Sequence, residues 1–353
     1  MIKPKHSVLN LECWPMPKKR GGCLCLNLNE NMFITPEKIK GIISELNLFE
    51  INQYPEYDRL TLLIAKYSGV KSPNVLLTNG ADQAIELVLR TFNRKKRVLM
   101  ILPTFSYYQH VCAVEGISIK KIFFNKRFDF PLNQILKNIQ KDIDGVLLCN
   151  PSNPLSTAIQ PNEIIQIIRK AKKCGCFVVV DEVYFEFHKS SLQKEIRGFN
   201  NLIIIRSFSK GHGLAGLRLG YIISDKENIS QFKKVRGPWD VNGFSVAFVL
   251  GMIHNKEWLS FLPDMNKIKK ELILLLQKKK WKVLDSHTNF LTFQVPDAEV
   301  FVHYMKKHRV LVCNLSSYPD SNGILKNYIR MGIPNKQDKD RIIGLLAKYD
   351  LFG

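Results

Sequence analysis

Short apolar runs alternate with amphipathic stretches through the middle of the chain. The runs are rich in Val, Ile and Leu, which is typical of strands that are buried on both faces of a sheet. They lie at 97–102, 117–123, 145–149, 176–180 and 202–206. Stretches with helical spacing lie between them, at 133–140, 161–174 and 191–197. Because such alternation is typical of crossover connections, the pattern predicts an α/β fold with a mainly parallel sheet.

The pattern changes toward both ends of the chain. Helices are expected there at 36–47, at 226–251 with a break at 237–238, and at 256–280, 297–307 and 337–349. Short strands are expected at 282–284, 290–294 and 310–312. We therefore predict a large domain at 48–240 and a smaller α+β domain formed by 1–47 together with 241–353.

The composition is that of a soluble globular protein. Hydrophobic residues make up 45% of the 353 positions and charged residues 24%, which allows a sizeable core. No apolar run approaches the length of a membrane span, and the N-terminal segment lacks the apolar core of a secretory signal. The eight cysteines do not show the usual spacing of zinc ligands, so we interpret them as reduced thiols of a cytoplasmic protein.

The net charge of +21 raises the possibility of a nucleic-acid partner. The positive residues, however, are spread along the chain in short runs such as 94–97 and 278–280, without a basic tail or a nucleic-acid motif. We therefore expect solvated faces and no nucleic-acid partner. A basic nucleic-acid-binding protein on an inactive enzyme scaffold is the alternative from another class.

Four of the predicted strands are followed by polar or aromatic side chains. Ligands of open α/β sheets bind beyond the carboxyl ends of the strands, so these segments are expected to meet at one site. The segments are 103–108, 150–154, 181–184 and 207–210.

The segment after the last of these strands carries Lys210 between Ser207 and Ser209, with Arg218 eight residues on. A buried lysine can form a Schiff base with an aldehyde, and burial lowers its pKa. Hydroxyls and a guanidinium can hold a phosphate. The combination predicts a pyridoxal phosphate site. The alternative is a surface lysine in a glycine-rich loop.

Asp181 ends an apolar strand, where a carboxylate is costly to bury without a positive partner. A protonated pyridine nitrogen would supply that partner and strengthen the cofactor as an electron sink. Tyr184 and Asn153 could hydrogen-bond the ring phenolate, and Tyr108 could stack on the ring. The alternatives are a capping aspartate, a turn asparagine and core tyrosines.

Two more segments offer anion-binding groups. The helix that begins within 78–82 leaves free backbone amides at a positive dipole end, although ordinary capping explains the same residues. Arg330 could clamp an acidic substrate group or lie on the surface. The histidines have no partners at metal-ligand spacing, so no metal site is expected.

These motifs, in this order and spacing, resemble the fold-type I pyridoxal phosphate enzymes of the class I/II aminotransferases. Within them the branch most similar to this chain is that of the histidinol-phosphate aminotransferases. The resemblance covers almost the whole chain, from 26–31 to 328–332. Its motifs lie at 54–55, 78–82, 103–108, 150–154, 181–184 and 207–221.

The resemblance implies a role for each residue at the site. Lys210 would be the Schiff-base lysine that moves the proton, with Asp181 and Tyr184 as the other catalytic residues. Arg330 and Asn29 would contact the substrate. In a homodimer with shared active sites, Tyr54 would reach the phosphate in the neighbouring subunit. The implied cofactor-binding residues are Gly80, Ala81, Asp82, Tyr108, Asn153, Asp181, Tyr184, Ser207, Ser209, Lys210, Arg218 and Tyr54.

The implied reaction moves an amino group from a donor, either histidinol phosphate-like or an amino acid, to a 2-oxo acid. A decarboxylase resembling threonine-phosphate decarboxylase is the alternative, because the same cofactor can support loss of carbon dioxide. One departure bears on the substrate. Where the histidinol-phosphate branch tends to carry an arginine after a strand, this chain has Cys313, which removes one charge-assisted contact to a phosphate.

Overall fold

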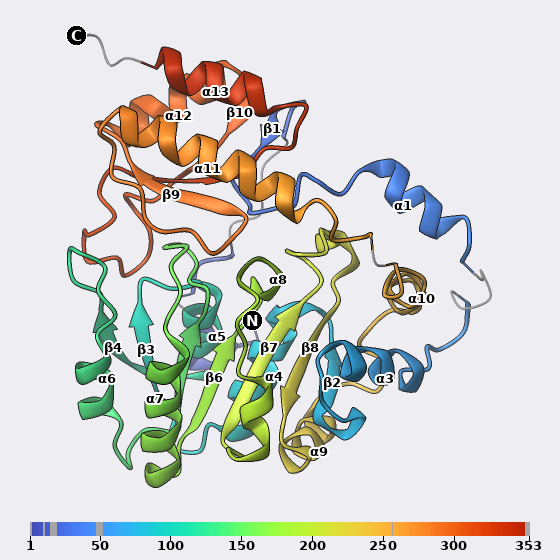
Figure 1. Ribbon diagram of the computed structural model, residues 1–353. Helices are drawn as coiled ribbons and strands as arrows, with labels where there is room; N and C mark the ends of the chain where they lie inside the picture. The colour runs from blue at the N-terminus through green and yellow to red at the C-terminus, as the bar shows by residue number, and fades with distance from the viewer. Residues whose placement is uncertain (1, 10, 15–19, 47–51, 256, 350–353) are drawn as a thin grey trace.

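A computed structural model describes residues 2–9, 11–14, 20–46, 52–255 and 257–349. It contains a large unit built on one sheet and a smaller unit that lies over the carboxyl ends of most strands of that sheet (Figure 1). None of the helices in these ranges is long and apolar enough to span a membrane.

The large sheet has seven strands in the order β2-β8-β7-β6-β5-β3-β4. β3 to β7 run parallel, as predicted, which confirms the α/β class. β8 was not predicted, and it runs antiparallel between β7 and β2. The strands are β2 (Val75–Thr78), β3 (Arg97–Leu102), β4 (Ser118–Phe123), β5 (Gly145–Cys149), β6 (Phe177–Asp181), β7 (Leu202–Ser207) and β8 (Gly220–Ser224).

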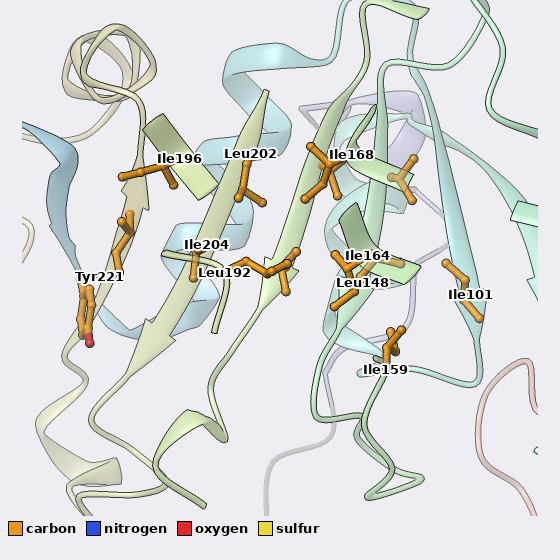
Figure 2. Packing of buried hydrophobic residues seen from close by; sticks show 14 of the residues in the cluster. Ile101, Leu148, Ile159, Ile164, Ile168, Leu192, Ile196, Leu202, Ile204 and Tyr221 are labelled. Carbon is orange, nitrogen blue, oxygen red and sulfur yellow. The ribbon is translucent and has the colours of Figure 1, made fainter. Parts of the chain in front are cut away.

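Helices cover both faces of this sheet because successive strand residues point to opposite faces. On β6, Val178 and Val180 join one apolar cluster and Val179 joins the other. Figure 2 shows part of the first cluster, where Ile164 and Ile168 pack against the sheet. Its helices are α3 (Asp58–Tyr67), α6 (Leu132–Asn138), α7 (Pro161–Cys174) and α10 (Gly243–Met252). The other face packs against α4 (Gly80–Phe92), α5 (Tyr107–Glu115) and α9 (Lys226–Val235).

The smaller unit has its own apolar cluster beneath three helices, α11 (Leu262–Lys278), α12 (Ala298–Lys307) and α13 (Lys339–Lys348). Its sheet, in the order β11-β12-β9, is antiparallel. The N-terminal segment belongs here because β1 pairs with β10. The strands are β9 (Phe290–Gln294), β11 (Cys313–Asn314), β12 (Tyr328–Gly332), β1 (Leu24–Cys25) and β10 (Val310–Leu311).

The structure corrects several predicted elements. The predicted helix at 191–197 is a 3-10 turn over Gln193–Arg197, and the predicted strand at 282–284 makes only an isolated bridge at Val283. The long helix expected from 256 begins at Leu262, with Pro263 in its first turn. Proline fits the first turn of a helix because the amides there have no helical partner.

The packing also bears on the predicted domain boundary at residue 240. α1 (Pro36–Ile43) and α10 lie against each other, and residues of both join the apolar cluster of the large sheet. In Figure 1 they flank the large unit at its side. We therefore propose that the large domain extends through α10 to Met252 and that α1 packs with it.

Candidate active site

The predicted site residues lie mostly where the parallel strands end. Asp181 is the last residue of β6, and Lys210 follows the end of β7 by three residues. These carboxyl ends face the smaller unit (Figure 1). The smaller unit adds residues from the N-terminal segment and from β12, so the site is formed where the two units meet.

Lys210 is partly buried, and its Nζ donates to the carbonyl oxygen of Leu28 at 3.1 Å. Burial, together with the nearby cation of Arg330, lowers the pKa of the Lys210 ammonium to about 8. The turn that carries the lysine is held by Asn31, whose Nδ2 donates to the carbonyl oxygens of Lys210 and Gly211 at 3.3 and 2.8 Å. The amine is therefore fixed in place and is readily deprotonated.

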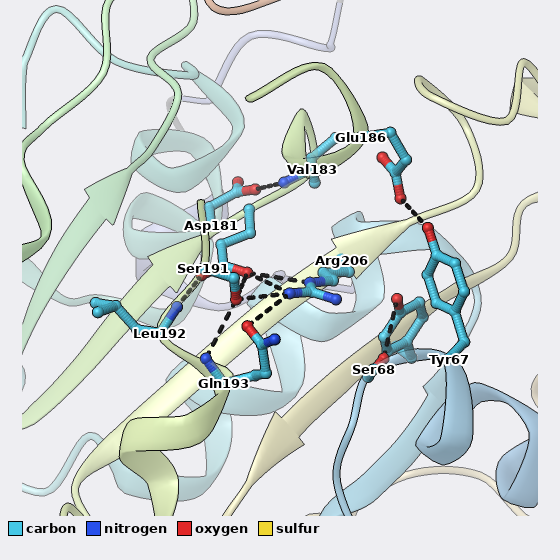
Figure 3. A network of polar contacts seen from close by, with 11 residues as sticks. Tyr67, Ser68, Asp181, Val183, Glu186, Ser191, Leu192, Gln193 and Arg206 are labelled. Atoms are coloured by element: carbon cyan, nitrogen blue, oxygen red, sulfur yellow. Dashed lines mark hydrogen bonds and ion pairs between the residues drawn. The ribbon is translucent and has the colours of Figure 1, made fainter. Parts of the chain in front are cut away.

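Asp181 is buried, with 3% of its surface exposed. One carboxylate oxygen accepts from the amide of Val183 at 3.1 Å (Figure 3), and the other accepts from the Tyr108 hydroxyl at 3.1 Å. Burial raises the pKa of Asp181 to about 7. Within the described ranges no cationic side chain pairs with it, so its negative charge lacks a neutralising partner.

The next carboxylate along the chain is different. Glu182 accepts from Nε and Nη2 of Arg206 at 3.0 and 2.9 Å, and both side chains are almost fully buried. Figure 3 labels Arg206 within this network of polar contacts. The Arg206 guanidinium also lies 3.7 Å from the centre of the Phe185 ring. The two charges of this pair offset each other without a ligand, which indicates a structural role for Glu182, whereas Asp181 has no such cation among the described residues.

The predicted substrate residues lie beside predicted cofactor residues. Nδ2 of Asn29 donates to the Tyr184 hydroxyl at 2.9 Å. Nη1 of Arg330 donates to Oδ1 of Asn153 at 2.6 Å, and its Nη2 donates to the backbone oxygen of Asn27 at 2.9 Å. Nε of Arg330 and Oδ1 of Asn29 are buried and have no hydrogen-bond partner in the part of the chain that the structure describes. Both groups therefore retain capacity for a ligand.

Arg218 lies at the N-terminus of α4. Its Nη2 contacts the Asp82 carboxylate at 2.7 Å, and its Nη1 donates to the Ser209 hydroxyl at 3.4 Å. Gly80 begins the helix with a φ of +73°, and a Cβ there would lie 2.5 Å from Nη2 of Arg218. The missing side chain thus leaves room for a guanidinium beside the free amides of Gly80, Ala81 and Asp82, which is a favourable place for a phosphate.

Two predicted phosphate ligands have other contacts. The Ser207 hydroxyl accepts from the amide of Ser209 at 3.1 Å and donates to the carbonyl oxygen of Leu219 at 3.4 Å, so it also holds the backbone of the turn. Tyr54 is 74% exposed and stacks on Trp239, with ring centroids 4.2 Å apart. Within this chain Tyr54 therefore lies outside the cluster of site residues. It would reach a site only in a neighbouring subunit.

Sequence reasoning missed several residues. The backbone carbonyl of Leu28 and the side-chain amide of Asn31 contact the segment that carries Lys210. The polar run at 27–31 was the signal in the sequence that could have indicated these two residues. Tyr318 donates to the carbonyl oxygen of Thr104 at 3.0 Å beside the site. Nothing in the sequence near Tyr318 connects it to the strand ends, because the loop that carries it lies far away along the chain.

The site residues fit pyridoxal phosphate on chemical grounds. The cofactor carries an aldehyde, a phosphate and a ring nitrogen that can be protonated. The cluster offers a buried amine, a guanidinium at a helix N-terminus and a buried carboxylate without a cation. For the amine and the carboxylate, an oppositely charged or reactive partner would offset a cost of burial.

Comparison with known proteins gives a consistent picture. Residues 22–342 match the family model for aminotransferase class I and II. A histidinol-phosphate aminotransferase of Thermoanaerobacter pseudethanolicus is 31% identical over 85% of this chain and 87% of its own length. The crystal structure of the histidinol-phosphate aminotransferase from Clostridium acetobutylicum has a TM-score of 0.84 at 23% identity, covering 92% of this chain and 98% of that one. L-threonine-O-3-phosphate decarboxylase from Porphyromonas gingivalis reaches 0.76 at 22% identity over 92% and 98% of the two chains.

Proposed function

The chain belongs to the class I and II aminotransferase family and is a pyridoxal phosphate-dependent aminotransferase, and from this premise we propose that it transfers an amino group from a donor to a 2-oxo acid with Lys210 as its acid–base group. The observation that carries the assignment of residues is the pair of charges at the strand ends. Lys210 and Asp181 are enclosed in one site, and neither is neutralised by an acidic or basic side chain among the described residues.

We assign the cofactor contacts by chemistry. Arg218, Ser209 and the amides that begin α4 would hold the phosphate, Asp181 would face the ring nitrogen, and Tyr184 and Asn153 would bind the phenolate. Tyr108 would lie by the ring, while its hydroxyl holds the Asp181 carboxylate. When bound, the cofactor withdraws electrons from the substrate and so weakens the bonds at its α-carbon.

Lys210 would move the proton at that carbon. A general base works best when its pKa lies near the working pH, because it must be deprotonated and still basic. Burial and the Arg330 cation bring the pKa of Lys210 to about 8, which satisfies this condition. The hydrogen bonds from Asn31 to the lysine turn keep the amine at one place, so the transfer would require little rearrangement.

We propose that Arg330 binds the carboxylate of the 2-oxo acid and of an amino acid donor. Its Nε is buried and has no hydrogen-bond partner among the described residues, so a carboxylate would complete its hydrogen bonding. Cys313 lies directly opposite Arg330 in the register of β11 and β12, and residues so placed share one face of a sheet. A thiol rather than a second guanidinium therefore borders this anion site, which favours an amino acid donor over histidinol phosphate.

A donor panel tests this function. The loaded enzyme is mixed with amino acids and with histidinol phosphate, and conversion of the cofactor to its amine form is followed by visible absorption. We expect amino acids to convert it and histidinol phosphate to do so weakly. Cys313→Arg should increase the conversion of the cofactor by histidinol phosphate. Strong conversion by histidinol phosphate in the unchanged enzyme would overturn the donor assignment, and release of carbon dioxide without conversion would identify a decarboxylase.

We also propose a homodimer with shared sites. Tyr54 and Trp239 form an exposed stacked pair, and Trp239 is 52% exposed. Apolar rings on a surface are favourable places for a partner. In this arrangement Tyr54 would reach the phosphate of the neighbouring subunit. Tyr54→Phe should weaken cofactor binding without changing the mass in solution, whereas a monomer with full activity would contradict the proposal.

The cytoplasmic location stays a proposal as well. All eight cysteines are free thiols. Free thiols are typical of reducing compartments. Cell fractionation with an antibody to the protein would test it.

A further inference from the structure

The loop at 315–327 joins β11 to β12, the two strands that carry Cys313 and Arg330. It begins and ends in the smaller unit, yet its apolar side chains Leu315 and Leu325 are fully buried in the cluster of the large sheet. The loop therefore spans the two units directly beside the substrate site.

Asp320 is the charged contact of this loop with the large unit. Its Oδ2 lies 2.7 Å from Nζ of Lys121 on β4. The same oxygen accepts a hydrogen bond from Nε2 of Gln109 on α5. Gln109 directly follows Tyr108, which hydrogen-bonds Asp181, so the attachment point lies one residue from the cofactor site.

A second contact lies two residues earlier in the loop. The Tyr318 hydroxyl donates to the carbonyl oxygen of Thr104, in the segment between β3 and α5. Burial raises the pKa of Tyr318 to about 12, so the hydroxyl keeps the proton that it donates. These two side-chain contacts thus attach the loop to the large unit near α5.

We propose that Asp320 is a positioning residue for the substrate site, which joins the 315–327 loop to Lys121 and Gln109 and thereby sets the place of Arg330. The inference rests on the proposed role of Arg330 in carboxylate binding. Arg330 itself is held by Asn153 and Asn27 at one end of the hairpin. Asp320 supplies the matching attachment at the far end of the loop.

The ion pair is half exposed, with 41% of the Lys121 side chain and 31% of the Asp320 side chain accessible. Such pairs contribute little to global stability, so a change here should act on the loop and leave the fold intact. The expected effect is therefore on substrate affinity. A role in general stability alone would instead lower the melting temperature and leave the KM unchanged.

The test reverses the charge at one end of the pair. Lys121→Glu places a carboxylate against Asp320, and in the loaded enzyme we expect the KM for the 2-oxo acid to rise about fivefold, with kcat changed less than about twofold. Trypsin should cleave faster after Lys326, which is exposed in the loop. Adding Asp320→Lys restores an ion pair of opposite direction and should return the KM toward that of the unchanged enzyme. Because the introduced lysine is itself a trypsin site, cleavage after Lys326 is followed by the mass of the fragment that begins at Asn327, and its rate should also fall back.

Lys120→Glu is the matched control. It makes the same change of net charge on the same strand, but neighbouring strand residues point to opposite faces of the sheet. It should alter neither KM nor cleavage. If Lys121→Glu changes neither value, or if the second substitution fails to rescue them, the positioning role is wrong. Arg330→Ala should raise the KM without faster cleavage, and an unchanged KM in that variant would instead overturn the proposed role of Arg330.

Discussion

Lys210 and Asp181 lie at the ends of neighbouring parallel strands, but they form no ion pair with each other. The lysine donates to the Leu28 carbonyl, and the aspartate accepts from Val183 and Tyr108. Burial lowers the pKa of Lys210 to about 8 and raises the pKa of Asp181 to about 7. Both groups are thus kept near the point of ionisation, with room for a molecule that carries the complementary charges.

Removal of the lysine amine should abolish turnover. We expect Lys210→Ala to lower the transamination rate at least about a thousandfold, because both the covalent attachment and the proton transfer depend on that amine. The fold should persist, since truncation removes a partly buried cation whose Nζ has one hydrogen bond, to Leu28, within the described ranges. Steady-state kinetics and circular dichroism measure the two effects. Lys226→Ala, at a side chain that is 70% exposed, is the control, and wild-type activity in Lys210→Ala would contradict the mechanism.

Asp181 should make the stability of the cofactor-free protein depend on pH. Its pKa of about 7 lies above the ordinary value of about 3.9. The folded state therefore binds this proton more tightly than the unfolded state, and stability falls as the pH rises from about 4 to about 7. Asp181→Asn cannot ionise, so this variant should be more stable than the unchanged protein at pH 8, by on the order of 3 kcal/mol, and should gain nothing at pH 4.

Urea unfolding of the cofactor-free proteins at several pH values measures this difference. Asp340→Asn, at a side chain that is 88% exposed, should show no such trend. A gain for Asp181→Asn that is equal at every pH would mean that packing, not ionisation, controls the effect.

Gly80 should be required for cofactor affinity. In Gly80→Ala the new Cβ would lie 2.5 Å from Nη2 of Arg218 and displace the guanidinium. Loss of a charge-assisted phosphate contact should weaken pyridoxal phosphate binding about 10- to 100-fold. Fluorescence titration of the cofactor-free protein with pyridoxal phosphate measures this affinity.

Gly175 provides a control for backbone strain in that experiment. It has a φ of +71°, close to the +73° of Gly80, and among the described residues no heavy atom outside its local backbone and chain neighbours lies within 4 Å of its ideal Cβ. Gly175→Ala should therefore lower stability by about 1–2 kcal/mol and leave cofactor affinity unchanged. Equal affinity losses in both variants would show that strain, rather than displacement of Arg218, is responsible.

The Glu182–Arg206 pair should be a strong determinant of stability. Arg206→Met leaves the buried Glu182 carboxylate without its cation and should lower the free energy of unfolding by about 3–5 kcal/mol. Arg97→Met breaks the exposed pair with Asp142 and should cost less than about 1 kcal/mol. Chemical denaturation compares the two. Similar losses in both variants would mean that the buried pair is not the cause.

The sequence was sufficient to predict the parallel sheet and the residues at its strand ends. Buried strands need continuous apolar runs, so those at 145–149 and 202–206 could be recognised locally. β8 could not be recognised, because its residues directly follow a glycine-rich loop. That loop contains no turn motif of the kind that marks a hairpin between two strands. The start of α11 was placed too early, since amphipathic spacing alone does not fix a helix terminus.

By itself the sequence determined the chemistry of the site, because Lys210, Asp181 and Arg218 are distinctive residue types that follow strands in a fixed order. Only the tertiary structure decided which groups those residues meet. Leu28 and Asn31 reach Lys210 from across the chain, and β-sheet register places Cys313 opposite Arg330. The physical reason is that such contacts depend on how two separately packed units lie against each other, and no local pattern in the chain records that arrangement.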